Sequence, residues 1–341
     1  MRRWQKRILV TVVVLLMLVS VGITATVGWT PFFGPKTRAL TDRRFEPSPA
    51  RIERGEYLVK HVTGCMHCHS ELDSSVRGLP IKEGRVGAGR SWAADGIPWL
   101  TAPNISSDRE TGAGSWTDDM FARATREGIG HDGRALFPVM PYGNYRNMSD
   151  EDLASVITYI RSLPAVRQAQ PKSAIPFPVS RFINAAPQPI DGVVAPPDLS
   201  TPEKRGQYLV TLGSCADCHS PMDERGQFVA GMDFAGGSTF VHDAREQKAA
   251  ANLTPAPSGI PYYTEDLFLE VMKTGRVRDR EISDVMPWGA YGGMTDEDLK
   301  AIFAYLKTLK PVDHFVDNAM PRTACARCGL EHGGGERNKK G

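Results

Sequence analysis

The sequence carries almost no net charge and no concentration of basic residues. Its 41 Lys and Arg against 39 Asp and Glu leave a formal net charge of +2, with a sequence pI of about 8.2. Its basic residues are scattered, whereas proteins that bind nucleic acid gather them into a stripe or patch. No nucleic-acid partner is therefore expected. The sequence also lacks any useful run of alternating apolar and polar residues, so its folded units are predicted to be α-helical.

Charge is missing altogether from residues 8–29, which follow a basic N-terminus containing Arg2, Arg3, Lys6 and Arg7. These 22 residues can cross a hydrocarbon core of about 30 Å as one helix. The basic flank stays on the cytoplasmic side, which places the rest of the chain outside. A cleaved signal peptide is the alternative, but its apolar region usually has about 7 to 15 residues. We expect a retained single-pass anchor in the cytoplasmic (inner) membrane, with the bulk of the chain on the periplasmic side.

Much of the chain occurs twice. RGEYLVKHVTGCMHCHS matches RGQYLVTLGSCADCHS, SWTDDMFARATREG matches YYTEDLFLEVMKTG, and MPYGNYRNMSDEDLASVITYIRSL matches MPWGAYGGMTDEDLKAIFAYLKTL. The matching stretches lie 150, 147 and 146 positions apart. A unit of roughly 110 residues is therefore present as a tandem pair, since solenoids need about three or more copies.

The repeats divide the chain into six segments. Residues 1–29 form the basic flank and transmembrane anchor, 30–50 a tether, 51–168 the first domain, 169–202 a proline-rich linker, 203–312 the second domain and 313–341 a tail with a third Cys pair. Proline at the density of the linker favours an extended connector. Because the tail is polar and glycine-rich, we expect it to be flexible.

Each repeat is predicted to contain three helices. The first precedes the Cys pair. The middle helix has a good N-cap in Thr117 and Thr264, and a glycine suited to its C-terminal end in Gly128 and Gly275. In the last helix, apolar residues recur at +3, +4, +7 and +10 in both copies.

The sequence Cys-x-x-Cys-His occurs once in each repeat. The residues are Cys65, Cys68 and His69 in the first copy, and Cys215, Cys218 and His219 in the second. This is the attachment sequence for c-type haem, in which both thiols bond to the ring and the histidine ligates the iron. A structural zinc site usually takes four ligands from two paired knuckles, but here the knuckles lie in separate repeats. A redox-active Cys pair usually lies in a βαβ unit, which the sequence does not show. We therefore predict two covalently bound haem c groups.

Two methionine positions recur as candidates for the second axial ligand. Met148 and Met294 stand just before the N-cap of the last helix, which is the position of a hydrophobic staple. Met140 and Met286 each precede a proline, which forces an extended loop that can reach across a haem. We predict Met140 as the ligand of the first iron and Met286 as the ligand of the second. His131 is disfavoured because its counterpart is an arginine.

Two further patterns call for an interpretation. Asn104 and Asn252 each begin an Asn-x-Ser/Thr sequence, which is typical of glycosylation acceptors. Their recurrence fits better with a shared structural role in the wall of the pocket. Arg90 is a candidate for contacting a haem propionate, although no pattern in the sequence establishes it.

The third Cys pair, Cys325 and Cys328, is followed by Gly329 where the other pairs have histidine. A third haem is therefore not predicted. Three interpretations are open: a local disulfide, a metal site with His332 that lacks an evident fourth ligand, or the remnant of a lost domain. Histidines without a counterpart in the other repeat, His314 among them, are interpreted as ordinary surface or hydrogen-bonded residues.

These motifs resemble those of bacterial membrane-anchored dihaem cytochromes c, over residues 48–312. Within that group the chain is most similar to the cytochrome subunits of membrane-bound alcohol, aldehyde and sugar-acid dehydrogenases. The resemblance implies an all-α fold, with an N-terminal transmembrane helix followed by two tandem class I cytochrome c domains. It also implies that Gly55 and Gly206 lie where the first helix of each unit crosses the last, near Tyr159 and Tyr305.

The function implied by this resemblance is electron transfer, not catalysis. We expect a dihaem cytochrome of a membrane-bound respiratory chain that accepts electrons from a dehydrogenase subunit. One alternative is a shuttle between a quinol-oxidising cytochrome bc complex and a terminal oxidase. Another is a dihaem peroxidase-like enzyme, which needs a haem with an open coordination position.

Overall fold

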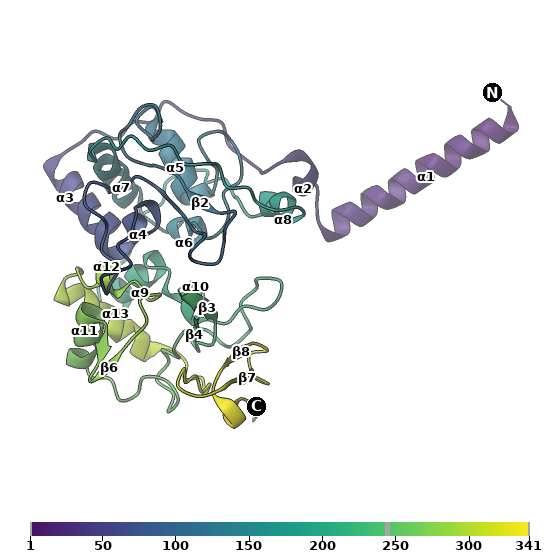
Figure 1. The fold of residues 1–341 in the computed structure, drawn as a ribbon. Helices are drawn as coiled ribbons and strands as arrows, with labels where there is room; N and C mark the ends of the chain where they lie inside the picture. The colour runs from purple at the N-terminus through teal and green to yellow at the C-terminus, as the bar shows by residue number, and fades with distance from the viewer. Residues whose placement is uncertain (1, 243–245, 340–341) are drawn as a thin grey trace.

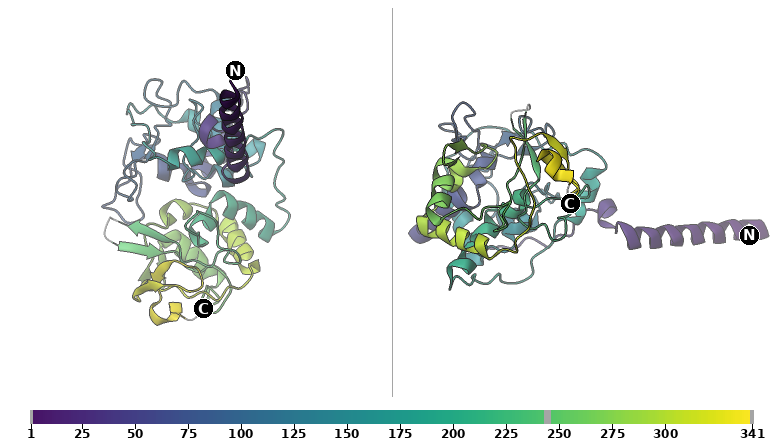
Figure 2. Two further views of the ribbon diagram at one scale, coloured as in Figure 1. Left: turned by 90° about the vertical axis from the view of Figure 1, so that its right-hand side faces the viewer. Right: turned by 90° about the horizontal axis from the view of Figure 1, so that it is seen from below.

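The computed structural model describes residues 2–242 and 246–339, and shows a long helix leading into a body of two similar helical units (Figure 1). Helix α1 (Arg3–Thr26) has 24 residues, none of them buried, and is long and apolar enough to cross a membrane. It projects away from the body (Figure 2). The short helix α2 (Thr30–Phe33) follows it.

The order of helices in the first unit recurs in the second. The first unit contains α3 (Pro49–Tyr57), η1 (Leu58–Val62), α4 (Cys65–His69), α5 (Asp118–Glu127), α6 (Tyr142–Tyr145) and α7 (Asp150–Ser162). The second contains α9 (Pro202–Leu212), α10 (Cys215–His219), α11 (Glu265–Thr274), α12 (Trp288–Tyr291) and α13 (Asp296–Thr308). The linker includes the short helices α8 (Val179–Phe182) and η2 (Ile183–Ala185), where an entirely extended segment was expected.

Among the residues that the structure describes, four two-stranded antiparallel sheets accompany the helices, so the structure is mostly but not entirely helical. They pair β1 (Arg90–Ser91) with β2 (Thr101–Ala102), β3 (Thr239–His242) with β4 (Glu246–Ala249), β5 (Arg276–Val277) with β6 (Arg280–Glu281), and β7 (Arg322–Ala324) with β8 (Glu331–Gly333). Strands this short contain too few residues for an alternating pattern to be detected.

The middle helix of each unit begins and ends as predicted. The side chains of Thr117 and Thr264 each accept a hydrogen bond, at 3.2 Å, from a backbone N–H in the first turn. Gly128 and Gly275 end these helices with φ of +74° and +66°. A residue with a Cβ is strained in that conformation, which accounts for glycine there.

The first and last helices of each unit cross at a glycine. Helix α3 packs against α7, and α9 packs against α13. A Cβ at Gly55 would collide with the carbonyl of Ser155 and lie 2.7 Å from Cβ of Tyr159. The equivalent atom at Gly206 would collide with Ala301 and lie 2.9 Å from Cβ of Tyr305. The position implied for both glycines is confirmed.

The segment before the first Cys pair is one residue longer than its counterpart. Eleven positions separate Arg54 from Cys65, but ten separate Arg205 from Cys215. In the first unit, the N–H of Thr63 donates to the carbonyl of Leu58 at 2.8 Å, five residues earlier. This is a π-turn, which accommodates the additional residue inside a continuous helix.

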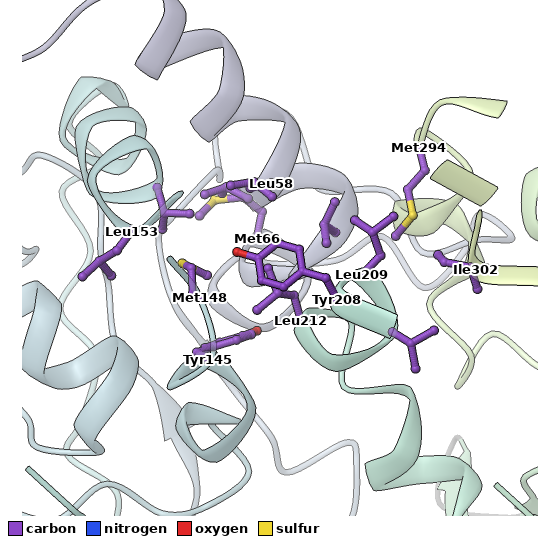
Figure 3. Close-up of a cluster of buried hydrophobic side chains, with 14 of the residues drawn as sticks. Leu58, Met66, Tyr145, Met148, Leu153, Tyr208, Leu209, Leu212, Met294 and Ile302 are labelled. Carbon is purple, nitrogen blue, oxygen red and sulfur yellow. The ribbon is translucent and has the colours of Figure 1, made fainter. Parts of the chain in front are cut away.

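The two units share one hydrophobic core. Figure 3 shows Leu58, Met66 and Met148 of the first unit beside Leu209 and Met294 of the second. Pairing of these faces removes from water the apolar surface that neither unit covers alone.

Two exchanged hydrogen bonds fix the contact between the units. Tyr208 of the second unit donates to Asp152 of the first at 2.7 Å, and Tyr57 of the first donates to Asp298 of the second. Each hydroxyl also accepts the backbone N–H of the residue that caps the last helix of the opposite unit, at 3.2 and 3.3 Å. The units therefore meet with approximate twofold symmetry.

The tail is folded where a flexible segment was expected. Strands β7 and β8 form a hairpin, followed by η3 (Gly335–Lys339), and β8 lies beside β4 of the second unit (Figure 1). The side chain of Asn338 donates to the carbonyls of Thr323 and His332, at 3.2 and 2.8 Å. Asn318 forms two bonds to the backbone of Ala249. Polar side chains thus satisfy the buried backbone of a segment with few large apolar residues.

Candidate functional site

Each Cys-x-x-Cys-His sequence forms a single short helix, α4 or α10. The residues that precede them, Gly64 and Ser214, have left-handed backbones with φ of +61° and +55°. This sharp entry separates the short helix from the long helix before it. The four cysteines Cys65, Cys68, Cys215 and Cys218 are not disulfide-bonded.

The ring of each motif histidine is oriented by a backbone carbonyl. Nδ1 of His69 lies 2.9 Å from the oxygen of Pro103, and Nδ1 of His219 lies 2.7 Å from that of Ala251. Burial lowers the pKa of both histidines, so their rings stay neutral. A neutral ring whose Nδ1–H is donated in this way presents Nε2 as a free metal ligand.

The motif cysteines are held as protonated thiols. Burial raises the pKa of Cys68 to about 11, and that of Cys215 to about 12. The pKa of Cys218 is raised to about 12 by burial first, and then by the charges of Asp217 and Cys68. Because Cys68 belongs to the first unit and Cys218 to the second, the two motifs lie near each other at the contact between the units, where Asn144 of the first unit donates to Asp217 of the second motif at 2.8 Å.

A pair of tyrosines that the sequence analysis did not select lies between the motifs. Tyr145 donates to the carbonyl of Thr63, and Tyr291 to that of Gly213, both at 2.8 Å. Burial raises the pKa of both tyrosines well above its ordinary value, with contributions from cysteines of the motifs. Their matched positions after the Met-Pro sequences were a signal that could have identified them.

The two pairs of methionines occupy different places. Met148 and Met294 are buried in the shared core, and Ser149 and Thr295 cap the following helices as predicted. The hydrophobic staples are thus supported by both burial and capping.

Met140 and Met286 are half-buried and pack at the edge of this core. The prolines after them have nearly the same backbone, with φ and ψ of −81° and 50° at Pro141 and −78° and 51° at Pro287. Assignment of both sulfurs as axial ligands stays a prediction. His131, the competing residue, stacks on Trp116 with ring centres 4.4 Å apart.

Asn104 and Asn252 have the shared structural role that their recurrence indicated. Each side chain is buried and donates to two carbonyls of the chain that leaves the last helix. The acceptors are Val166 and Gln168 in the first unit, and Val312 and His314 in the second. This asparagine clamp holds that chain against the loop carrying the acceptor of the histidine Nδ1–H, and its burial disfavours glycosylation.

The donor set of each unit fits a covalently bound haem c. Two protonated thiols and one neutral, oriented histidine come from a single turn of helix, as thioether bonds and iron ligation require. In the first unit, Arg90 lies close enough for its charge to lower the pKa of His69. Its Nε is buried without a hydrogen-bond partner. Its Nη1 is paired with Asp95, so the unpartnered Nε–H is the donor beside the motif that fits the anionic propionate of such a group.

Comparison with known proteins agrees with this assignment. Residues 52–164 match the cytochrome c family. The gluconate 2-dehydrogenase cytochrome c subunit of Pantoea cypripedii is 31% identical over 296 residues, which cover 79% of this chain and 62% of that protein. The cytochrome c subunit of the quinone alcohol dehydrogenase of Gluconacetobacter polyoxogenes is 32% identical, over 77% of this chain and 57% of the subunit.

A shorter relative is covered more completely. The diheme cytochrome c-type protein of Cereibacter sphaeroides is 28% identical over 270 residues, which cover 76% of this chain and 86% of that protein. By contrast, the chain spans less than two thirds of the length of the two dehydrogenase subunits.

Proposed function

We propose that this chain, which contains a cytochrome c domain at residues 52–164 and is related to cytochrome c subunits of dehydrogenases, carries electrons on two covalently bound haem c groups. Its electron donor would be a dehydrogenase partner. The observation that carries the proposal is the duplicated donor set, in which a backbone carbonyl fixes the histidine of each motif.

Each unit would hold one haem c. Cys65, Cys68, His69 and Met140 would bind the first group, and Cys215, Cys218, His219 and Met286 the second. Bound haem c supplies a one-electron iron couple whose potential depends on its axial ligands and surroundings. The carbonyls of Pro103 and Ala251 keep each histidine in one tautomer, and the hydroxyls of Tyr145 and Tyr291 are tied to the backbone. The protein thus contributes a rigid, partly buried setting.

The similarity of the two units favours electron transfer over a peroxidase-like activity. A dihaem peroxidase needs one group with an open coordination position, so its two ligand loops should differ. Here the Met-Pro loops share their backbone conformation and lead into equivalent short helices, α6 and α12. Both units therefore support the same methionine ligation, which fills the coordination sphere.

A retained membrane anchor is part of the proposal. Trp29, Phe32 and Phe33 are exposed where α1 ends and α2 begins. Helix α8 packs against α2 and adds exposed Phe177 and Phe182 beside it. Aromatic residues gathered next to a spanning helix are typical of the membrane–water boundary. We place α1 in the cytoplasmic membrane and both units against its periplasmic surface.

Haem staining of the full chain after denaturing electrophoresis tests the cofactor count, because thioether-bound haem survives denaturation. We expect two haems per chain, one in the Cys65→Ala/Cys68→Ala variant, one in Cys215→Ala/Cys218→Ala, and none when all four cysteines are replaced. A wild-type chain without covalent haem would refute the proposal.

The axial ligands are tested by visible spectroscopy and redox titration of Met140→Ala and Met286→Ala. Each variant should lose the methionine–iron absorption of one haem and lower the potential of that haem alone. Met120→Ala is the matched control, since Met120 lies in the first unit but has leucine as its counterpart. If both haems are unchanged in both variants, the ligand assignment is wrong.

The donor is tested by purifying the full chain from membranes of its source. A dehydrogenase that copurifies and reduces the haems with its substrate would support the proposed partner. Reduction by a quinol-oxidising complex alone would instead favour the shuttle between that complex and a terminal oxidase.

A further inference from the structure

The third Cys pair lies in a buried cluster of four metal-binding side chains. Cys325, Cys328, His314 and His332 have exposed fractions of 5%, 4%, 1% and 0%. Their potential ligand atoms all lie within 4.8 Å of one another. The fourth ligand that the sequence did not reveal is His314, which comes from the chain leaving α13 and not from the hairpin.

The hairpin positions the other three ligands. Cys325 and Cys328 lie in the turn between β7 and β8, and His332 lies on β8, paired with Thr323. The N–H of Cys325 donates to Leu330 at 2.8 Å, and that of Gly329 donates to Cys325 at 2.9 Å. Gly329 has φ of +77°, a conformation that favours glycine. The residue that replaces the haem-ligating histidine thus permits the turn that brings the two thiols together.

Both histidines direct the same nitrogen into the cluster. Nδ1 of His314 lies 2.8 Å from the carbonyl of Ala235, and Nδ1 of His332 lies 3.0 Å from that of Gly333. In neutral rings these nitrogens are the donors, so each Nε2 carries a lone pair. The two Nε2 atoms are only 3.1 Å apart. Two acceptors at that distance repel each other, and a cation between them removes the repulsion.

Two of the separations between these atoms are close to those of tetrahedral coordination. For bonds of about 2.0–2.1 Å to nitrogen and about 2.3 Å to sulfur, zinc places two nitrogens about 3.3 Å apart, and a nitrogen about 3.6 Å from a sulfur. The observed separations are 3.1 Å between the nitrogens and 3.4 Å between Sγ of Cys325 and Nε2 of His314.

We propose that His314, Cys325, Cys328 and His332 form a structural Cys2His2 site for a divalent metal of the zinc class, which fastens the C-terminal hairpin to the second unit. Two thiolates and two imidazoles suit zinc and fill a tetrahedral sphere, so no position remains for a substrate. Zinc has no redox chemistry of its own. The site therefore stands apart from the haem groups in function.

The surroundings of the cluster connect it to the second haem motif. A Cβ at Gly237 would lie 2.7 Å from the ring of His314 and 3.6 Å from Sγ of Cys328. The neighbouring Gly236 donates its N–H to the carbonyl of His219 at 2.7 Å. The ring of His314 therefore packs against the same loop that contacts the motif, and the metal would hold this loop and the hairpin in one position.

The test uses the full chain with both haems attached, dialysed against ZnCl₂ under reducing conditions and then against metal-free buffer. We expect one zinc per chain by elemental analysis. X-ray absorption at the zinc edge, which haem iron does not obscure, should give two sulfur and two nitrogen ligands. Less than one tightly bound zinc per chain, or a shell of nitrogen and oxygen only, would overturn the proposal.

Variants assign the site to these residues. Cys328→Ser and His332→Gln should each weaken zinc binding by more than about 100-fold, beyond the effect of losing an outer-shell partner. His131→Gln, a histidine of the first unit outside the cluster, should keep one zinc. Haem content reports folding in every variant. Unchanged zinc in Cys328→Ser with full haem content would refute the assignment.

Thiol titration separates this site from a disulfide between Cys325 and Cys328. The other four cysteines would be thioether-bound in the holoprotein, so two thiols should react in denaturant after zinc is removed. They should be protected from the reagent while zinc is bound. A chain isolated with no reactive thiol, which binds no zinc after reduction, would establish the disulfide instead.

Discussion

In both units an asparagine ties the loop after the haem motif to the chain leaving the last helix, but that chain then takes different routes. In the first unit it continues into the linker, where Gln170 donates to the carbonyl of Ala88 at 3.1 Å. In the second it continues into the hairpin, and Nδ1 of His314 lies 2.8 Å from the equivalent carbonyl of Ala235. The equivalent carbonyl thus accepts a hydrogen bond from the amide of Gln170 in the first unit and from the ring of His314, a proposed metal ligand, in the second.

The space beside the motif is also filled differently. Arg90 of the first unit forms an ion pair with Asp95 at 2.6 Å and lies over the ring of Trp92. Its counterpart is Gly237, beside which the ring of His314 packs. The bonds that position the haem ligands are therefore common to both units, whereas the adjoining volume accepts either an arginine or a buried cluster. The duplicated scaffold tolerates this exchange because the asparagine clamp does not depend on it.

The largest predicted loss of unfolding free energy comes from the helix crossings, whose contacts are equivalent in the two units. Gly55→Leu or Gly206→Leu forces a side chain into a backbone carbonyl and should cost at least about 3 kcal/mol of unfolding free energy. Denaturant unfolding followed by far-UV circular dichroism measures it. Gly143→Ala is the control, since a Cβ there meets no atom within 4 Å. A marked difference between the two leucine variants would break the equivalence.

The second-largest loss of unfolding free energy is expected at the asparagine clamps. Asn104→Ala and Asn252→Ala each remove two hydrogen bonds of a buried side chain, and they take the asparagine donor from the carbonyl of Gln168 or His314, so about 2 kcal/mol should be lost from either unit. The exposed Asn147→Ala serves as the control. If the proposed metal fastens the second unit, removing it by chelation should increase the loss in Asn252→Ala and leave Asn104→Ala unaffected. Equal sensitivity to the chelator would contradict that asymmetry.

A smaller effect is expected at the exchanged tyrosines. Tyr57→Phe and Tyr208→Phe each remove one hydrogen bond to a carboxylate in the contact between the units, for about 1 to 2 kcal/mol. Tyr208→Phe should cost more, because Tyr208 is buried and Tyr57 half-buried. Unfolding free energies of both single variants and the double variant test this order. A larger loss in Tyr57→Phe would show that the contact is less symmetric than its bonds indicate.

The smallest predicted effect is the loss of folding stability that Tyr57 causes at alkaline pH. Burial, followed by the hydrogen bond to Asp298, raises the pKa of Tyr57 to about 12, from about 10 in an unfolded chain. The unfolded state then loses its proton first, so stability should fall as pH rises from about 10 to about 12. Tyr57→Phe should make this slope shallower. An unchanged slope in Tyr57→Phe would remove Tyr57 as its source.

The features that could be predicted from the sequence were those that occur in both repeats. The haem motifs, the caps at Thr117 and Thr264 and the crossing glycines each depend on a few adjacent residues, or appear twice at matched positions. The exchange of Tyr57 and Tyr208 between units was not accessible, because it depends on how two domains dock. His314 was missed for a similar reason: it lies eleven positions before Cys325, outside the hairpin that carries the other three ligands. Composition alone also suggested a flexible tail, although Asn338 satisfies carbonyls of its backbone and Asn318 binds it to Ala249 of the second unit.

The π-turn at η1 has a consequence for how this chain can change in length. An insertion in an α-helix rotates every later residue by about 100° around the axis, which would turn a haem motif away from its pocket. Here the additional residue is accommodated within Leu58–Val62, and the histidine of each motif still lies against the equivalent carbonyl, that of Pro103 or Ala251. His61 in this turn places Nδ1 3.0 Å from the carbonyl of Ala290, and a Cβ at Gly293 would collide with its ring. The additional residue of the first unit thus gives the contact between the units an interaction, that of His61 with Ala290, which the second unit does not reproduce.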